Sequence, residues 1–156
     1  MTTIQRKISL DSIKLFLNQK DVAIAGISRK PEKFGNAIFK EMTLKGFHLY
    51  PVHPEIIEHE GVQCFSSIEK LPSEVTALII CTKPDKTLQL VKDAIDKGIH
   101  HIWLQQGAKN EDAVNYALNH NINLIYGRCI LMFADPVNSV HKFHRFISRL
   151  FGAYPR

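Results

Sequence analysis

The sequence predicts an α/β fold in which a parallel sheet of about five strands is covered by helices on both faces. Short apolar runs alternate with segments of helical periodicity along almost the whole chain. These runs are apolar throughout rather than alternately polar and apolar, which is typical of strands buried on both faces. The alternating order implies right-handed crossovers and therefore indicates a doubly wound, Rossmann-like sheet.

Strands are expected where a β-branched, apolar run is bounded by turn residues. They are 22–27, 47–52, 76–82, 99–104 and 122–126. With the strands numbered along the chain, we expect the sheet order 3-2-1-4-5 and a ligand crevice between the first and fourth strands. The segment 55–72 predicts a loop, a small strand near 62–65 and a short helical turn.

Helices are expected between the strands, with recognisable start and stop signals. Pro84 lies near the start of one helix and Asn110 is a candidate N-cap of the next. Gly46 and Gly98 are expected to end two helices, because glycine accepts the left-handed conformation. A short helix near 13–17 precedes the first strand. An apolar stripe near 140–150 predicts an additional C-terminal helix that docks on the domain or forms a homodimer contact.

Length and composition predict one globular domain over residues 1–156, and the last segment, 135–156, is expected to be a helical extension of it. The net charge of +5 suits an anionic partner, but its carriers are spread along the chain and signal nucleic acid only weakly. The three cysteines are widely spaced, which fits a reducing cytoplasm better than a disulfide framework or a zinc site. The sequence shows neither a membrane-spanning stretch nor a signal peptide.

The most informative segment is the junction after the first expected strand. Gly26 ends an apolar run, small, polar and basic residues follow, and Gly35 opens a helical pattern. Such a junction presents backbone N–H groups and a helix N-terminus to an anion, most often a phosphate. Ser28 stands where the G-x-G-x-x-G pattern has its second glycine, and Arg29 and Lys33 add two cations. The spacing therefore departs from the G-x-G-x-x-G pattern, but the segment still offers groups that can bind a phosphate.

The residues that follow the second expected strand argue against NAD as the ligand. Folds that bind NAD place Asp or Glu there to accept hydrogen bonds from the ribose diol, whereas this chain has no acid before Glu55. Two prolines flank Val52 and His53 and fix a rigid, apolar corner that suits a flat base. His53 is expected to be a hydrogen-bonding loop residue rather than a catalyst, because no acidic side chain is placed to orient it.

In these segments the chain resembles the small stand-alone CoA-binding domain proteins, which share their fold with the N-terminal domain of the succinyl-CoA synthetase α subunit. The matching segments are 22–29, 33–36, 50–54, 81–84, 103–107 and 128–129. The resemblance covers about residues 15–132, which it implies are the core of the domain. The resemblance implies coenzyme A as the ligand. It places the CoA phosphates at Gly26, Ile27, Ser28, Arg29, Lys33, Phe34, Gly35 and Asn36. It places adenine beside Val52, His53 and Pro54, the nucleotide flank at Thr82, Lys83 and Pro84, and the pantetheine end at Gln106 and Gly107. The family commonly has Asn at the position of His53.

The resemblance and the residues together favour non-catalytic binding of CoA or an acyl-CoA, in a sensing, carrying or regulatory role. No nucleophile–base pair or pair of carboxylates can be recognised at the strand ends, so enzyme activity stays an open question. One alternative is an NAD(P)-binding oxidoreductase or redox sensor, and His53 and Lys83 leave NADP open. Another is a partner subunit for a separately encoded ligase domain of an acyl-CoA synthetase.

Cys129 is the best candidate for a reactive residue, because a cation such as Arg128 beside it can lower the pKa of a thiol. Cysteine is, however, among the most frequently buried residue types, and a buried structural role is the favoured interpretation.

Overall fold

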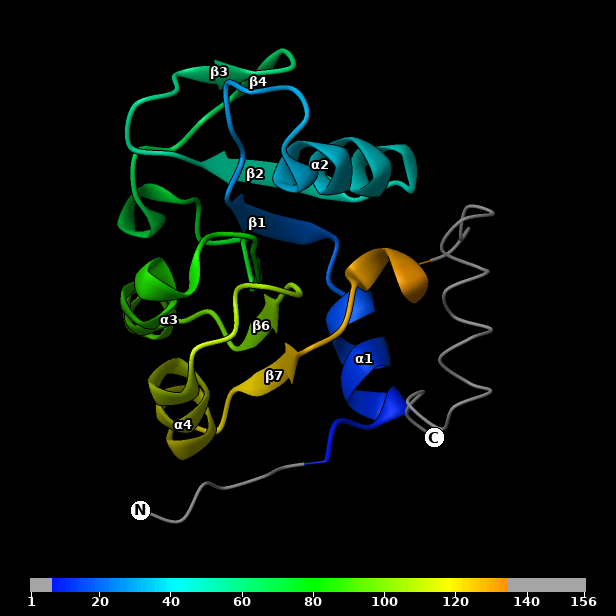
Figure 1. The fold of residues 1–156 in the computed structure, drawn as a ribbon, viewed down its shortest axis with the longest axis vertical. Helices are drawn as coiled ribbons and strands as arrows, with labels where there is room; N and C mark the ends of the chain where they lie inside the picture. The colour runs from blue at the N-terminus through cyan, green and yellow to red at the C-terminus, as the bar shows by residue number, and fades with distance from the viewer. Residues whose placement is uncertain (1–6, 135–156) are drawn as a thin grey trace.

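The centre of the molecule is a parallel sheet of five strands (Figure 1). The computed structural model describes residues 7–134. In sheet order the strands are β2 (His48–Val52), β1 (Asp21–Ala25), β5 (Ala77–Ile80), β6 (His101–Leu104) and β7 (Asn123–Tyr126). All four residues of β5 are buried, as are four of the five in β1, which explains the continuous apolar runs. The predicted α/β fold with a doubly wound parallel sheet is confirmed.

The predicted strand order is wrong. Numbered along the chain without the small hairpin, the observed order is 2-1-3-4-5. Successive strands are therefore added in opposite directions on the two sides of the boundary between the first and third strands, β1 and β5. Pro51 explains why the third strand of the chain does not pair with the outer edge of β2, as the predicted order required. The Pro51 carbonyl accepts from Phe65 N–H at 2.8 Å on the outer side of β2, and the missing N–H of Pro51 would face that same side. A strand there would lose a ladder bond, which confines β2 to the edge.

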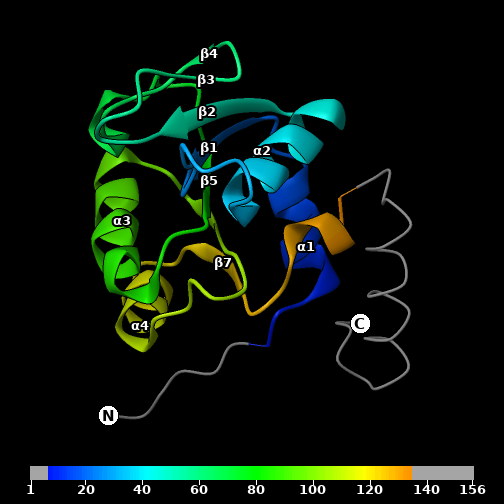
Figure 2. The ribbon, with the colours of Figure 1, turned by 45° about the horizontal axis from the view of Figure 1, so that its top comes forward.

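Two pairs of helices cover the two faces of the sheet (Figure 2). On one face lie α1 (Leu10–Leu17) and α2 (Phe34–Leu44), together with the short helix η2 (Ile130–Met132). On the other lie α3 (Pro84–Lys97), α4 (Glu111–Asn119) and the short helix η1 (Ile68–Lys70). Alternate residues of each strand enter opposite cores: Val22 and Ile24 pack under α1 and α2, whereas Ala23 and Ala25 face α3 and α4.

The helix ends follow the sequence signals. Pro84 is the first residue of α3, and Gly98 ends that helix with φ +90°. The Asn110 side chain caps α4 by accepting from Ala113 N–H at 3.0 Å. Gly46 follows α2, and the expected short helix before the first strand is α1. These predictions are confirmed.

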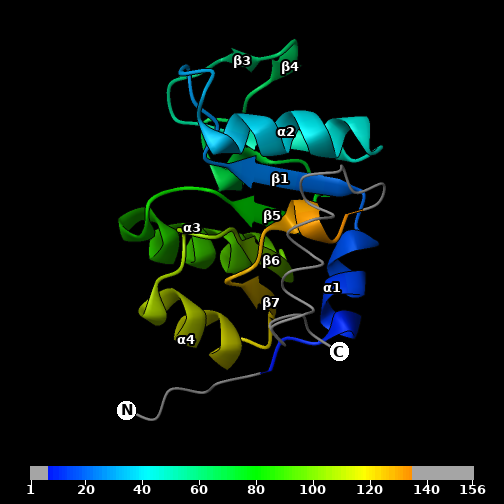
Figure 3. The ribbon, with the colours of Figure 1, turned by 45° about the vertical axis from the view of Figure 1, so that its right-hand side comes forward.

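A small hairpin lies beyond the β2 edge of the sheet, beside the loop that follows β1 (Figures 1 and 3). Its strands are β3 (Glu58–His59) and β4 (Val62–Gln63). The chain then touches the end of β2 through a parallel bridge between Val52 and Phe65 and enters η1. The expected small strand and helical turn are therefore present, and the strand is one half of a hairpin.

The predicted C-terminal helix and homodimer contact fall on residues 135–156, which lie outside the described residues. Within residues 7–134, no helix combines the length and apolar character needed to span a bilayer.

Candidate functional site at the carboxyl ends of β1, β2 and β5

A cavity of about 660 Å³ opens where β1, β2 and β5 end, at the point where the strand order switches. We call it the main cavity. It brings together several predicted site residues from three separate strand ends. These are Gly26 and Ile27 after β1, Val52, His53 and Pro54 at β2, and Thr82 after β5.

The main cavity also has walls that the sequence reasoning missed. One is the segment of Ser66, Ser67 and Ile68 that leads into η1. The other is one side of α3, which contributes Asp85, Lys86, Gln89, Leu90 and Asp93. The spacing i, i+1, i+4, i+5, i+8 on α3 is a helical face, and the buried residues Thr87, Val91 and Ala94 lie on another face of the same helix. This second, partly polar face of α3 is visible in the sequence and could have indicated a cavity wall.

The two glycines of the β1–α2 loop are held by close packing within the domain. Gly26 has φ +116°, and a Cβ built on it would lie 2.6 Å from the Cys81 carbonyl carbon. A Cβ on Gly35 would lie 2.1 Å from the Gly26 carbonyl oxygen. The start of α2 therefore packs directly against the backbone of Gly26, and Gly26 packs directly against Cys81, the residue after β5. A substitution at Gly26 consequently perturbs the fold as well as any approach of a ligand.

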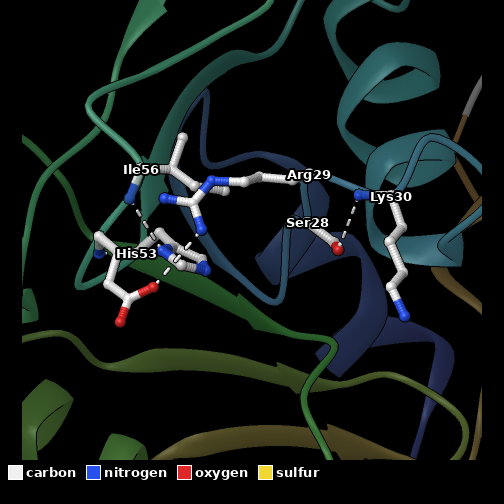
Figure 4. A network of polar contacts seen from close by, with 6 residues as sticks. Ser28, Arg29, Lys30, His53 and Ile56 are labelled. Carbon is white, nitrogen blue, oxygen red and sulfur yellow. Dashed lines mark hydrogen bonds and ion pairs between the residues drawn. The ribbon is translucent and has the colours of Figure 1, made fainter.

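Asn36 fixes the shape of the loop between those glycines. Its amide Nδ2 donates to the carbonyls of Ser28 and Lys30, and its Oδ1 accepts from Ser28 N–H, each at 2.9 Å. The Ser28 hydroxyl in turn accepts from Lys30 N–H at 3.1 Å (Figure 4). Asn36 is buried, and both of its amide hydrogens are used in these bonds. Its amide therefore holds the β1–α2 loop in one shape.

Arg29 leaves this loop and reaches across to the corner after β2 (Figure 4). Its guanidinium lies 3.5 Å from the Glu55 carboxylate, and both side chains are mostly exposed. Ser28, Arg29 and Asn36 line a second hollow of about 240 Å³ between this loop and the hairpin, which we call the side groove. The exposed Arg29–Glu55 pair adds little stability, so Arg29 can turn to an anionic ligand at small cost.

His53 lines the main cavity, and its ring is bonded to the backbone of Ile56, which lines the side groove. Nδ1 accepts hydrogen bonds from the backbone N–H groups of Glu55 and Ile56, both at 3.0 Å (Figure 4). Nδ1 is then the unprotonated nitrogen and Nε2 carries the proton. Burial and the nearby Arg29 lower the pKa of His53, whereas Glu55 raises it. The prediction that His53 is a hydrogen-bonding loop residue is confirmed.

Two helix N-termini at this edge of the sheet have no side-chain cap. The N-cap residues Lys33 of α2 and Lys83 of α3 make no capping hydrogen bond, whereas Ser9 caps α1 and Asn110 caps α4. Uncapped N–H groups and the positive end of the helix dipole favour an anion. Thr82, which lines the main cavity, adds a buried hydroxyl with no hydrogen-bond partner.

The remaining predicted residues line neither the main cavity nor the side groove. Lys33, Phe34, Lys83 and Pro84 are exposed at the starts of α2 and α3. Gln106 and Gly107 are exposed in the loop after β6, apart from both hollows.

Burial opposes ionisation of the thiols in this region by raising their pKa values. Burial raises the pKa of Cys129, which is 4% exposed, so the expectation that Arg128 lowers it is wrong. Arg128 instead uses its backbone carbonyl to accept from the Trp103 indole N–H at 3.0 Å. Burial also raises the pKa of Cys81 to about 12. The favoured interpretation of Cys129 as a buried structural residue agrees with this geometry.

A family model described as a CoA binding domain matches residues 20–135. The chain belongs to the CoA-binding domain family. The match spans all five strands of the main sheet and every residue that lines the main cavity. The resemblance read from the sequence is therefore confirmed.

Proteins similar to this chain differ greatly in length. The uncharacterized protein YneT of Bacillus subtilis is 23% identical over 117 residues, which cover 75% of this chain and 87% of that protein. The alpha subunit of the ADP-forming acetate–CoA ligase II of Pyrococcus furiosus is 25% identical over 126 residues. Those residues cover 74% of this chain but only 28% of the ligase subunit.

A solved structure of a conserved hypothetical protein from Pyrococcus furiosus is 34% identical, with a TM-score of 0.69. The matched region covers 71% of this chain and 96% of that one.

Proposed function

We propose that this chain binds coenzyme A or an acyl-CoA in the main cavity without converting it chemically. The observation that carries the proposal is the cavity at the switch between β1 and β5, in a chain whose family is defined by CoA binding. Its volume of about 660 Å³ lies within the range of sites for small molecules and cofactors.

The charges and apolar groups around the cavity suggest an orientation for the ligand. The diphosphate lies against the β1–α2 loop, where the backbone at Gly26, the uncapped start of α2 and the cations Arg29 and Lys33 are available. Lys83 adds a cation at the start of α3. Adenine packs near Val52 and Pro54, and the pantetheine arm runs toward Gln106 and Gly107, as in the family resemblance.

Binding without turnover agrees with the state of the candidate reactive groups. The Nδ1 atom of His53 is occupied by two backbone N–H groups, so this atom is unavailable as a general base. Burial raises the pKa values of Cys64, Cys81 and Cys129, which opposes a thiolate nucleophile at neutral pH. The free thiols are consistent with a cytoplasmic location, which is part of the proposal.

A second candidate is a subunit that works with a separately encoded ligase domain. It is favoured by the similarity to the acetate–CoA ligase alpha subunit, of which this chain spans about a quarter. Both candidates require the same CoA site and differ in whether a partner protein is present.

Native mass spectrometry of freshly purified protein, followed by calorimetric titration with CoA, tests the proposal. We expect saturable binding of CoA and much weaker binding of NAD and NADP. Tighter binding of either dinucleotide would favour the oxidoreductase alternative and overturn the proposal, as would failure of CoA to bind. Co-purification of a ligase-type protein would support the partner-subunit candidate.

A pair of lysine variants tests the position of the phosphates. Lys33→Ala removes a cation at the start of α2, whereas Lys40→Ala removes an exposed cation farther along the same helix. We expect Lys33→Ala to weaken CoA binding about threefold to tenfold at low salt, with a smaller effect at high salt. Equal effects of the two variants would contradict placement of the diphosphate at this helix end.

A further inference from the structure

The turn of residues 53–56, whose His53 and Pro54 line the main cavity, depends on one side chain. The backbone of His53 is anchored, because its N–H donates to the Phe65 carbonyl at 2.9 Å. The far end of the segment is anchored by Cys64 N–H, which donates to the Ile57 carbonyl at 2.8 Å. Between these anchors, the N–H groups of Glu55 and Ile56 both donate to Nδ1 of His53. The imidazole thus organises the turn that carries Pro54, another residue of the cavity wall.

Only the neutral ring can make these two bonds. Protonation places a hydrogen on Nδ1, which then faces two N–H donors at 3.0 Å. Rotating the ring by 180° does not restore an acceptor, because both nitrogens of an imidazolium are donors. The two backbone N–H groups would lose their shared acceptor, and with it the turn loses the contact that ties its backbone to the His53 ring.

We propose that His53 is a positioning residue whose neutral, Nε2-protonated ring holds the 53–56 turn in its binding shape, so that acidification releases the turn and weakens ligand binding. This inference rests on the proposed binding of CoA in the main cavity. His53 acts on the ligand through the turn that it organises.

The charged groups around the ring support the direction of this effect. Arg29, from the loop after β1, lies close enough to oppose a second positive charge, while Glu55 in the same turn favours one. Across the main cavity α3 contributes Asp85, Lys86 and Asp93. Burial and Arg29 lower the pKa of His53 below its usual 6.5 in the folded protein. An opened turn returns the ring toward that usual value, so the closed turn loses stability as the pH falls below about 6.5.

His53→Asn is the matched control, because its Oδ1 can accept backbone N–H groups two and three residues along the chain without titrating. His53→Leu fits the space but offers no acceptor. The first measurement follows the imidazole nitrogens and the Glu55 and Ile56 amides of the ligand-free protein by NMR between pH 8 and pH 5. We expect the Nε2–H tautomer at pH 8, and amide shifts at residues 55 and 56 that move together with protonation of His53.

The second measurement is CoA affinity over the same pH range in the native protein and in His53→Asn. The phosphate groups of CoA also titrate near pH 6, but they do so equally for both proteins, so the ratio of affinities isolates His53. We expect this ratio to fall by up to about tenfold per pH unit below the NMR midpoint. His53→Leu should bind weakly at every pH, with residues 55 and 56 already shifted at pH 8.

Each result decides the inference. A constant affinity ratio, or a ratio that rises on acidification because His53⁺ attracts the ligand phosphates, would overturn it. Finding the Nδ1–H tautomer at pH 8 would also overturn it. So would amide chemical shifts at residues 55 and 56 that stay constant while His53 titrates. If CoA fails to bind at any pH, the proposed function fails, while the NMR titration still decides whether His53 holds the turn. Normal amide shifts in His53→Leu would overturn the positioning role independently of CoA.

Discussion

Replacing Gly35 by alanine should destabilise the domain, although alanine is the better helix former. The new Cβ would lie 2.1 Å from the Gly26 carbonyl oxygen, and ordinary contact begins at about 3.4 Å. The start of α2 must therefore move by about 1.3 Å. Asn36 is the next residue and would move with Gly35. Its three hydrogen bonds of 2.9 Å to the loop would then be broken. At about 1 kcal/mol each, their loss outweighs a gain in helix propensity of up to about 1 kcal/mol.

We therefore expect Gly35→Ala to lower the free energy of unfolding by about 2 kcal/mol, which shifts the urea midpoint by about 1 M. The single tryptophan, Trp103, is completely buried and reports unfolding by its fluorescence. Ala37→Gly, at an exposed position on the same helix, calibrates the propensity effect in the opposite direction. A Gly35→Ala protein as stable as the native one would refute the packing argument, since propensity would then have decided the outcome.

Three further outcomes are expected. Asn36→Ala should lower the free energy of unfolding by about 2–3 kcal/mol in urea melts, because three loop hydrogen bonds are lost together, and a change below about 0.5 kcal/mol would contradict the role of Asn36 in the loop. Thr82→Val should leave the urea midpoint unchanged, because the Thr82 hydroxyl has no partner, yet should weaken CoA binding several-fold in calorimetry; unaltered affinity would exclude this hydroxyl from the site. The native protein should react slowly with Ellman's reagent at pH 8, because burial raises the pKa of all three thiols, and one rapidly reacting cysteine would disprove this account.

Local patterns in the sequence predicted the elements of the fold well, because buried parallel strands and capped helices leave clear local signals. Pro84, Gly98 and Asn110 mark helix ends in the structure as they do in the sequence. The sheet order could not be read in the same way, since every buried apolar run has the same composition. One local signal did bear on it: Pro51 lacks the N–H that an outer neighbour of β2 would need.

The candidate site was predicted at the strand ends but not along the walls that close it. Gly26, His53 and Thr82 follow strands, and a parallel sheet brings their positions to one edge. Asp85 and Gln89 belong to a helix, and the side of a helix that meets a cavity depends on how the helix packs. The rotation of α3 is set by contacts such as the Thr87 hydroxyl, which donates to the Ala108 carbonyl at 2.6 Å. That contact joins residues distant in sequence, so local periodicity does not contain it.

The amide of Asn36 has a thermodynamic consequence for recognition. By tying the β1–α2 loop to its own backbone, it fixes the geometry of that loop before any ligand arrives. In the proposed function, the ligand phosphates would meet preorganised donors here, and little conformational entropy would be lost on association at this side of the cavity.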